Sequence, residues 1–193
     1  MAEDRSTNDS VRLANHFLIA MPALADPNFS QTVTYVCEHN EQGAMGIVIN
    51  RPTEVTLGDL FEHMGLETNE HSPSTGTVFV GGPVKRDRGF VLHPPDSPWE
   101  SSIKISDEVA LTTSRDILAA LARGRGPDRC LVALGYAGWG AGQLEEEMGQ
   151  NAWLSGPADP EVIFQTAYED RWHAAALRLG IDISRLSSET GHA

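Results

Sequence analysis

The pattern of apolar and polar positions predicts an antiparallel pair of strands in the first third of the chain. Apolar and polar side chains alternate over residues 32–39 and again over 44–50, and the four residues 40–43 between them have the length of a hairpin loop. A period of two places alternate side chains on opposite faces, so the pair should present one face to a core. The residues expected on that face of the first strand are Val33, Tyr35 and Cys37.

Helical periodicity marks three later stretches of the chain. Thr56 can cap a helix over residues 57–64, and Gly65 can end it. The two other predicted helices cover residues 115–122 and 168–179, and further strands are expected over 16–21, 77–80, 90–92, 103–105 and 129–136. Hairpin signals and isolated helices, without regular alternation of strands and helices, indicate an α+β fold in a single domain.

The most specific segment is Gly135–Glu145, which holds four glycines around one tryptophan. It predicts a buried strand that runs into a tight loop, followed by a short helix over 143–148 with carboxylates in its first turn. We interpret the loop as a packing device in which Trp139 covers the end of the strand and at least one glycine has a positive φ. The open alternative is a ligand loop, in which Trp139 stands over a cleft.

Four segments, in this order, carry a resemblance to a known family: residues 20–39, 43–52, 81–93 and 135–154. Together they resemble the bacterial YqgE/AlgH family over about residues 13–187, and we expect a disordered leader over 1–12 and a tail over 188–193. The resemblance implies a small cytosolic protein with a bent, branching, mostly antiparallel β-sheet flanked by helices. One branch of the family is labelled a regulator of alginate synthesis, a genetic label that implies no contact with DNA.

Composition narrows the classes of partner. The chain has 14 basic and 27 acidic residues, a net charge of −13, and its only lysines are Lys85 and Lys104. Proteins that bind duplex DNA need a basic face to displace counterions, so we expect neither nucleic acid nor an anionic membrane as a partner. No apolar run reaches the ~20 residues of a membrane helix, and the two cysteines have no disulfide or zinc spacing. We therefore expect a cytoplasmic location.

Five residues form the candidate functional cluster: Cys37, His39, Arg51, Arg88 and Trp139. In a regular strand Cys37 and His39 share a face, where the histidine could lower the pKa of the thiol; the alternative is that Cys37 is a small core residue. The two arginines could bind an anion or, in the interpretation we favour, pair with surface carboxylates.

No cofactor or metal is expected. His39, His63 and His93 could meet Cys37 only through the fold, and no metal-binding spacing is present. The leading hypothesis is a non-enzymatic protein that binds another protein or a small ligand, with an indirect role in transcription implied by the family label. The alternatives are a thiol-based redox sensor or enzyme that uses Cys37 and, ranked last, a DNA-binding regulator, because the helices at 57–64 and 115–122 are too far apart for a helix-turn-helix.

Overall fold

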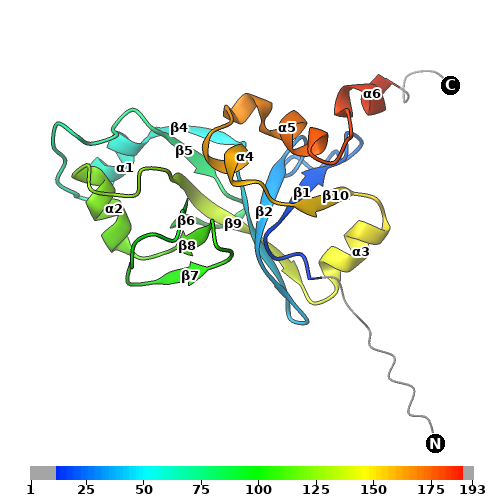
Figure 1. The fold of residues 1–193 in the computed structure, drawn as a ribbon, viewed down its shortest axis with the longest axis horizontal. Helices are drawn as coiled ribbons and strands as arrows, with labels where there is room; N and C mark the ends of the chain where they lie inside the picture. Colours follow the sequence, from blue (N-terminus) through cyan, green and yellow to red (C-terminus); the bar gives the residue numbers. More distant parts are fainter. Residues whose placement is uncertain (1–11, 189–193) are drawn as a thin grey trace, which may run out of the picture.

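A bent sheet of ten strands organises the fold, and the computed structural model describes it over residues 12–188 (Figure 1). The leader predicted over 1–12 and the tail over 188–193 lie outside this range, apart from Arg12 and Ser188. The strands are β1 (His16–Ala20), β2 (Val33–Asn40), β3 (Gly43–Val48), β4 (Pro52–Thr56), β5 (Thr77–Val80), β6 (Val84–His93), β7 (Ser102–Lys104), β8 (Ala110–Thr112), β9 (Leu131–Gly140) and β10 (Trp153–Pro157).

The sheet is mostly antiparallel and branches at β9. Neighbours along the path β10-β1-β2-β3-β9-β6-β8-β7 all pair antiparallel. Off this path, β5 pairs parallel with β9 and antiparallel with β4. The predicted α+β fold with a bent, branching sheet is therefore confirmed, and so is the predicted hairpin of β2 and β3.

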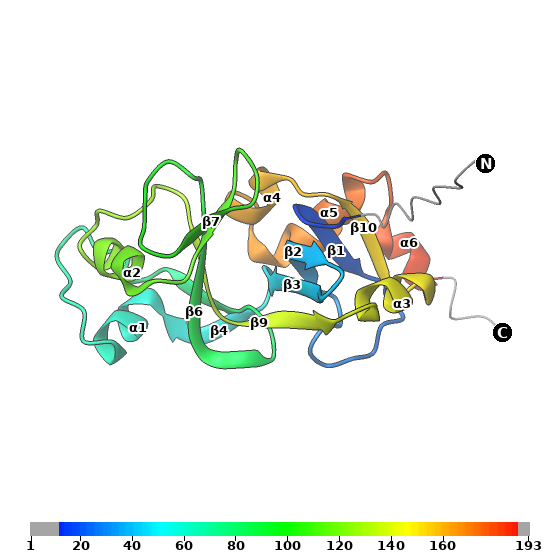
Figure 2. The same ribbon diagram turned by 90° about the horizontal axis from the view of Figure 1, so that it is seen from below.

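β9 connects the two ends of the molecule (Figure 2). Its first half lies between β5 and β6, and its second half pairs with β3. The backbone N–H of Val48 donates to the carbonyl of Gly81 at 2.8 Å, which joins β3 to the start of the turn after β5. The branch thus arises because β3 and β5 follow one another along one edge of the same long strand.

Gly135 marks the point where the two halves of β9 meet. Its φ is +79°, and a Cβ at this position would lie 2.5 Å from the carbonyl oxygen of Gly82 and 3.0 Å from that of Val84. The predicted tight loop from Gly135 onward is therefore wrong: β9 continues to Gly140, and only residues 141–142 turn into the following helix. Pairing with β3 keeps this glycine-rich segment extended, and such a long-range contact leaves no local signal in the sequence.

The predicted helices are present, with small changes at their ends. Thr56 caps the first one in a capping box with Asp59, and Gly65, at φ +66°, follows its end. The predicted helix over 168–179 is divided into a 3₁₀ turn and an α-helix. The helical elements are α1 (Leu57–His63), α2 (Arg115–Ala122), α3 (Gln143–Gly149), α4 (Pro160–Phe164), η1 (Tyr168–Asp170), α5 (Arg171–Leu177) and α6 (Ile183–Ser188).

Three groups of buried side chains form the core. The largest group includes Tyr35, which is fully buried, and Trp172 of α5, whose indole N–H donates to the Ala20 carbonyl at 2.9 Å. A second group includes Phe61 of α1 and residues of α2, and a third includes Leu144 of α3. Figure 2 shows α1 and α2 at one end and α3 at the other, so the second and third groups lie at opposite ends of β9.

Candidate functional site

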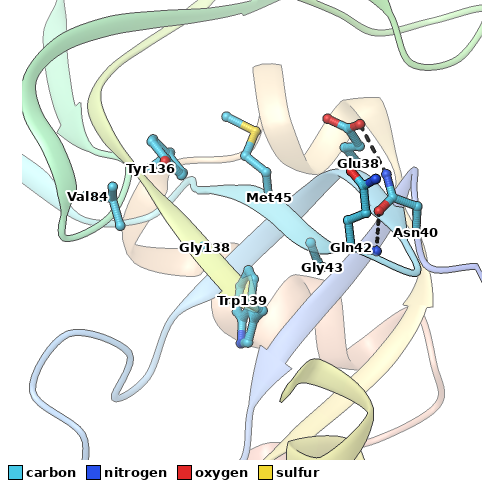
Figure 3. Close-up of a pocket in the computed structure, with 10 residues that line it drawn as sticks. Glu38, Asn40, Gln42, Gly43, Met45, Val84, Tyr136, Gly138 and Trp139 are labelled. Atoms are coloured by element: carbon cyan, nitrogen blue, oxygen red, sulfur yellow. Dashed lines mark hydrogen bonds between the residues drawn. The ribbon is translucent and has the colours of Figure 1, made fainter. Parts of the chain in front are cut away.

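A hollow of about 450 Å³ opens where β3 pairs with the second half of β9 (Figure 3). We call it the hairpin hollow, because the β2–β3 hairpin forms one side of it. The residues that line it are Glu38, Asn40, Gln42, Gly43, Ala44, Met45, Val84, Tyr136, Gly138 and Trp139.

A glycine leaves room in the middle of this hollow. Gly138 lies opposite Met45 in the β3–β9 register and is exposed, although it is in the interior of a strand. A Cβ on Gly138 would lie 3.3 Å from the ring of Tyr136 and 3.9 Å from Val84. Tyr136 and Met45 are half-buried, and Figure 3 shows both side chains on the same side of the strands. Because Gly138 has no side chain, it leaves a space between the ring of Tyr136 and the thioether of Met45.

The opposite rim of the hollow is polar and acidic. Among the lining residues that the structure describes, Glu38 alone carries a formal charge. The side-chain amide of Asn40 donates to the Glu38 carboxylate at 3.3 Å, and the Asn40 carbonyl accepts from the backbone N–H of Gln42 at 2.8 Å (Figure 3). The second bond fixes the side chain of Asn40 and the first joins that side chain to the carboxylate, so the rim offers a hydrogen-bond acceptor beside apolar surface.

Cys37 and His39 lie on opposite faces of β2, so the prediction that they share a face is wrong. The β2–β3 register shifts between Val36 and Glu38, and the extra residue of this irregularity reverses the alternation beyond it. Cys37 remains in the largest core group with an exposed fraction of 8%. Burial, with a smaller contribution from Glu38, raises the pKa of its thiol well above the usual range. His39 therefore does not activate this thiol.

Both ring nitrogens of His39 are already engaged. Its Nδ1 atom accepts from the backbone N–H of Leu13 at 3.0 Å, so the ring proton is on Nε2, which donates to the Glu145 carboxylate at 2.6 Å. The backbone N–H of Glu145 and then the hydrogen bond from His39 lower the pKa of that carboxyl. A histidine bound at both nitrogens connects β2, α3 and the chain before β1, and has no free lone pair for base catalysis.

The two arginines of the predicted cluster make other contacts than expected. Arg51 donates from its guanidinium to the backbone carbonyls of Pro27 and Ser30, and so holds the turn over residues 26–30. Arg88 lies over the ring of Phe90, 5.8 Å from its centroid. These contacts are with backbone carbonyls and with an aromatic ring, and they differ from the predicted pairs with surface carboxylates.

Trp139 is packed, as the packing interpretation predicts. Its exposed fraction is 5%, and its ring stacks on Phe29 at 6.0 Å and meets Trp153 edge-on at 6.2 Å. Figure 3 shows it pointing to the opposite side of β9 from Tyr136. Two of the four glycines around it, Gly135 and Gly142, have a positive φ, whereas Gly138 does not.

The structure thus separates the five predicted residues. Trp139 lies at the hairpin hollow, His39 lies beside α3, and Cys37 is in the core. Glu38 and Met45, which line the hollow, were not among the candidate site residues, and Tyr136 and Gly138 were considered only as part of the segment Gly135–Glu145. One local signal for it exists: Tyr136 and Gly138 are two residues apart in a strand, so the aromatic ring covers the neighbouring glycine on the same face.

Within residues 12–188, no group of three or more histidine, cysteine, aspartate or glutamate residues could hold a metal ion. None of the helices there combines the length and apolar character that crossing a membrane requires.

Comparison with known proteins identifies close relatives over almost the whole chain. The family model described as AlgH-like matches residues 17–184. A UPF0301 protein of Thioalkalivibrio sulfidiphilus is 58% identical over 184 residues, which cover 95% of this chain and 98% of that protein. A UPF0301 protein of Nitrosococcus oceani is 55% identical over 179 residues, 93% of this chain and 96% of its own length.

Solved structures agree with this assignment. The solution structure of the AlgH protein from Pseudomonas aeruginosa matches with a TM-score of 0.78 at 49% identity, and the match covers 100% of both chains. A crystal structure of a Corynebacterium diphtheriae protein matches with a TM-score of 0.70 at 18% identity over 97% of this chain and 99% of that one, which is a likeness of fold alone. The resemblance carried by the four sequence segments is confirmed, and the chain belongs to the AlgH-like family.

Proposed function

We propose that this protein acts by binding, without catalysis, and that the hairpin hollow receives a positively charged group of its ligand. The observation that carries the proposal is the Glu38 carboxylate, which Asn40 orients at the rim of a hollow walled by Tyr136 and Met45. Catalysis by the predicted cluster has little support, because the Cys37 thiol is buried with a raised pKa and both nitrogens of His39 are occupied.

The chemistry of the hollow favours an ammonium or guanidinium group. A carboxylate forms strong charge-assisted hydrogen bonds with such donors, and the face of an aromatic ring attracts a cation that comes to lie over it. The Met45 thioether is polarisable and can adapt to an alkyl chain. A volume of about 450 Å³ is within the range of small-ligand sites. The same group could come from a free organic amine or from a lysine or arginine side chain of a partner protein.

The charge of the whole chain supports this class of ligand. A net charge of −13 attracts cations and repels phosphate backbones, so any connection with transcription would be indirect. The separation of α1 and α2 by more than fifty residues also disfavours a helix-turn-helix. Two free cysteines fit a reducing compartment, and we propose a cytoplasmic location on that basis.

Binding to isotope-labelled protein can be followed by NMR with n-butylamine, which is cationic at neutral pH, and with 1-butanol as its neutral counterpart. We expect butylamine, and not butanol, to shift the backbone resonances of Met45 and Gly138. An acetylated hexapeptide with one lysine, added in a separate titration, tests the protein source of the same group. Tighter binding of the peptide than of butylamine would favour a partner protein.

Two matched variants decide the role of the carboxylate. Glu38→Gln should weaken binding of butylamine about tenfold, since removing a charged partner costs roughly 1.5 kcal/mol. Glu41→Gln makes the same change in charge on the same hairpin but outside the lining of the hollow, and should leave the affinity unchanged. Equal affinities for the two variants, or equal shifts with butylamine and butanol, would refute the proposal.

A further inference from the structure

A chain of three hydrogen-bonded side chains crosses the end of the sheet at β6, β8 and β7. His93 at the end of β6 is fully buried, and its Nε2 atom lies 2.6 Å from the hydroxyl of Thr112 on β8. The Thr112 hydroxyl lies 2.5 Å from the hydroxyl of Ser102, its partner in the β7–β8 register. This series of hydrogen bonds begins at a buried histidine and ends at an exposed serine on the edge strand of the sheet.

The donor and the acceptor of each hydrogen bond in this series follow from the protonation of His93. The carbonyl oxygen of Pro94 can only accept, so the Nδ1 atom of His93, 2.7 Å away, carries a proton. Burial lowers the pKa of His93, which leaves the ring neutral and its Nε2 atom with a lone pair. Thr112 gives its one proton to that lone pair. Ser102 must therefore donate its own proton to Thr112.

This arrangement prepares the Ser102 oxygen for attack on an electrophile. Its proton is held by a hydrogen bond that leads to a base, and residue 102 is itself exposed. Within residues 12–188, β7 pairs with β8 alone and ends the strand order, so no other described strand covers its outer edge. Serine becomes a nucleophile in proteins when a base accepts its proton in this way.

We propose that Ser102 is a nucleophilic serine that accepts acyl groups from activated esters. Its Oγ atom attacks the carbonyl carbon of the ester, a new O–C bond forms, and the bond to the leaving group breaks. The serine proton moves to the Thr112 oxygen as the Thr112 proton moves to Nε2 of His93. The leaving group departs as an anion, and the products are an O-acylated Ser102 and a protonated His93. This acylation is stoichiometric, without turnover, and is independent of binding at the hairpin hollow.

The test compares two neighbouring serines in one protein. The folded protein is treated with p-nitrophenyl acetate at neutral pH, and acetylation of Ser101 and Ser102 is quantified by tandem mass spectrometry. Ser101 is also exposed; its backbone N–H donates to the Ser114 hydroxyl, and among the described residues no hydrogen bond joins its side chain to a histidine. We expect Ser102 to react about a hundredfold faster, at the low end of what general-base assistance provides. Equal rates at the two serines would overturn the proposal without the need for any variant.

Three variants separate proton relay from packing. Thr112→Val keeps the shape of the side chain and removes the relaying hydroxyl, so acetylation of Ser102 should fall to the rate of Ser101. Thr112→Ser retains a hydroxyl, so Ser102 of this variant should keep most of the wild-type acetylation rate. His93→Gln removes the base, so its Ser102 should react as slowly as Ser101. Unchanged acetylation of Ser102 in folded Thr112→Val would show that the network only satisfies buried polar groups and would refute the proposal.

Discussion

The Nε2 atom of His39 donates a hydrogen bond to the carboxylate of Glu145 across 2.6 Å, between residues 106 positions apart in the chain. The other ring nitrogen of His39 accepts from the backbone of Leu13. One buried side chain therefore connects the chain just before β1, the β2–β3 hairpin and α3. The histidine that was a candidate for chemistry is instead a structural link beside the hairpin hollow.

Replacing His39 should destabilise the protein more than replacing its carboxylate partner. His39→Ala leaves the buried N–H of Leu13 without a partner, which we expect to lower the free energy of unfolding by about 1–3 kcal/mol. Glu145→Gln keeps an oxygen that can accept from Nε2, so its cost should be below about 1 kcal/mol. Urea denaturation measures both. A loss for His39→Ala no larger than that for the exposed Glu41→Ala would contradict this account.

Trp139 should be among the side chains on which stability depends most. Its ring is 5% exposed and packs against two other aromatic rings, so Trp139→Ala should cost about 3–5 kcal/mol. Thermal unfolding should show a fall in melting temperature of many degrees. Ile103→Ala is the control, because Ile103 has an exposed fraction of 60% and should change stability little. A melting temperature of Trp139→Ala close to the wild-type value would exclude the packing role.

Two glycines with nearly the same φ should respond differently to alanine. Gly135 (φ +79°) has backbone oxygens close to the position of a Cβ, whereas Gly142 (φ +75°) has no atom within 4 Å of it. Gly142→Ala should therefore cost only the roughly 1 kcal/mol of left-handed backbone. Gly135→Ala adds a collision with the turn after β5, which should cost about 2 kcal/mol more. Chemical denaturation of both variants makes the comparison, and equal losses would show that the turn yields freely.

Neither cysteine should react readily in the folded protein. Burial raises the pKa of Cys130 to about 11 and that of Cys37 further, so both thiols stay protonated at neutral pH. We expect iodoacetamide at pH 7.5 to modify Cys130 slowly, because it is partly exposed, and Cys37 only after denaturation. Mass spectrometry of each cysteine-containing peptide follows the two rates. Fast modification of Cys37 in the native protein would revive the redox-sensor hypothesis.

Acid should weaken the fold partly through His93. Because the pKa of His93 is lowered in the folded protein, the unfolded chain takes up a proton near pH 6.5 while the folded protein does not. The stabilising contribution is present above about pH 6.5 and is lost as the pH falls below it. His93→Gln should therefore show a smaller decrease in unfolding free energy between pH 7 and pH 5.5 than the wild type. An equal decrease in the unfolding free energy of the two proteins would disprove the contribution of His93.

Elements with a strong local signal could be predicted from the sequence. Thr56 and Gly65 delimit α1 where their capping preferences place them, and the alternation of β2 and β3 is apparent from their residues alone. β10 was missed because Ser155, Gly156 and Pro157 rarely form strands, and it exists because β1 offers a free edge. α4 has the signal of Asp159 before Pro160, but five residues are too few for a periodic pattern.

For the candidate site, the sequence predicted the residue types but not their neighbours. It located Cys37 and His39 on one strand, yet the register shift beside Glu38 decides which face each one uses. The sequence marked the glycines around Trp139 as unusual. Pairing with β3, however, decides that Gly138 lies in an extended strand, next to the ring of Tyr136. Alternation assumes an unbroken strand, and a bulge is a property of the pair of strands that meet.

The sequence by itself determined the family, the α+β class, the acidic charge and the local elements, because each depends on residues close together in the chain or on composition. Only the tertiary structure decided which side chains meet. The bond from His39 to Glu145, the relay from Ser102 through Thr112 to His93, and the hollow between Glu38 and Tyr136 all join separate strands or helices. Their geometry comes from strand register and packing, which are collective properties of the folded chain.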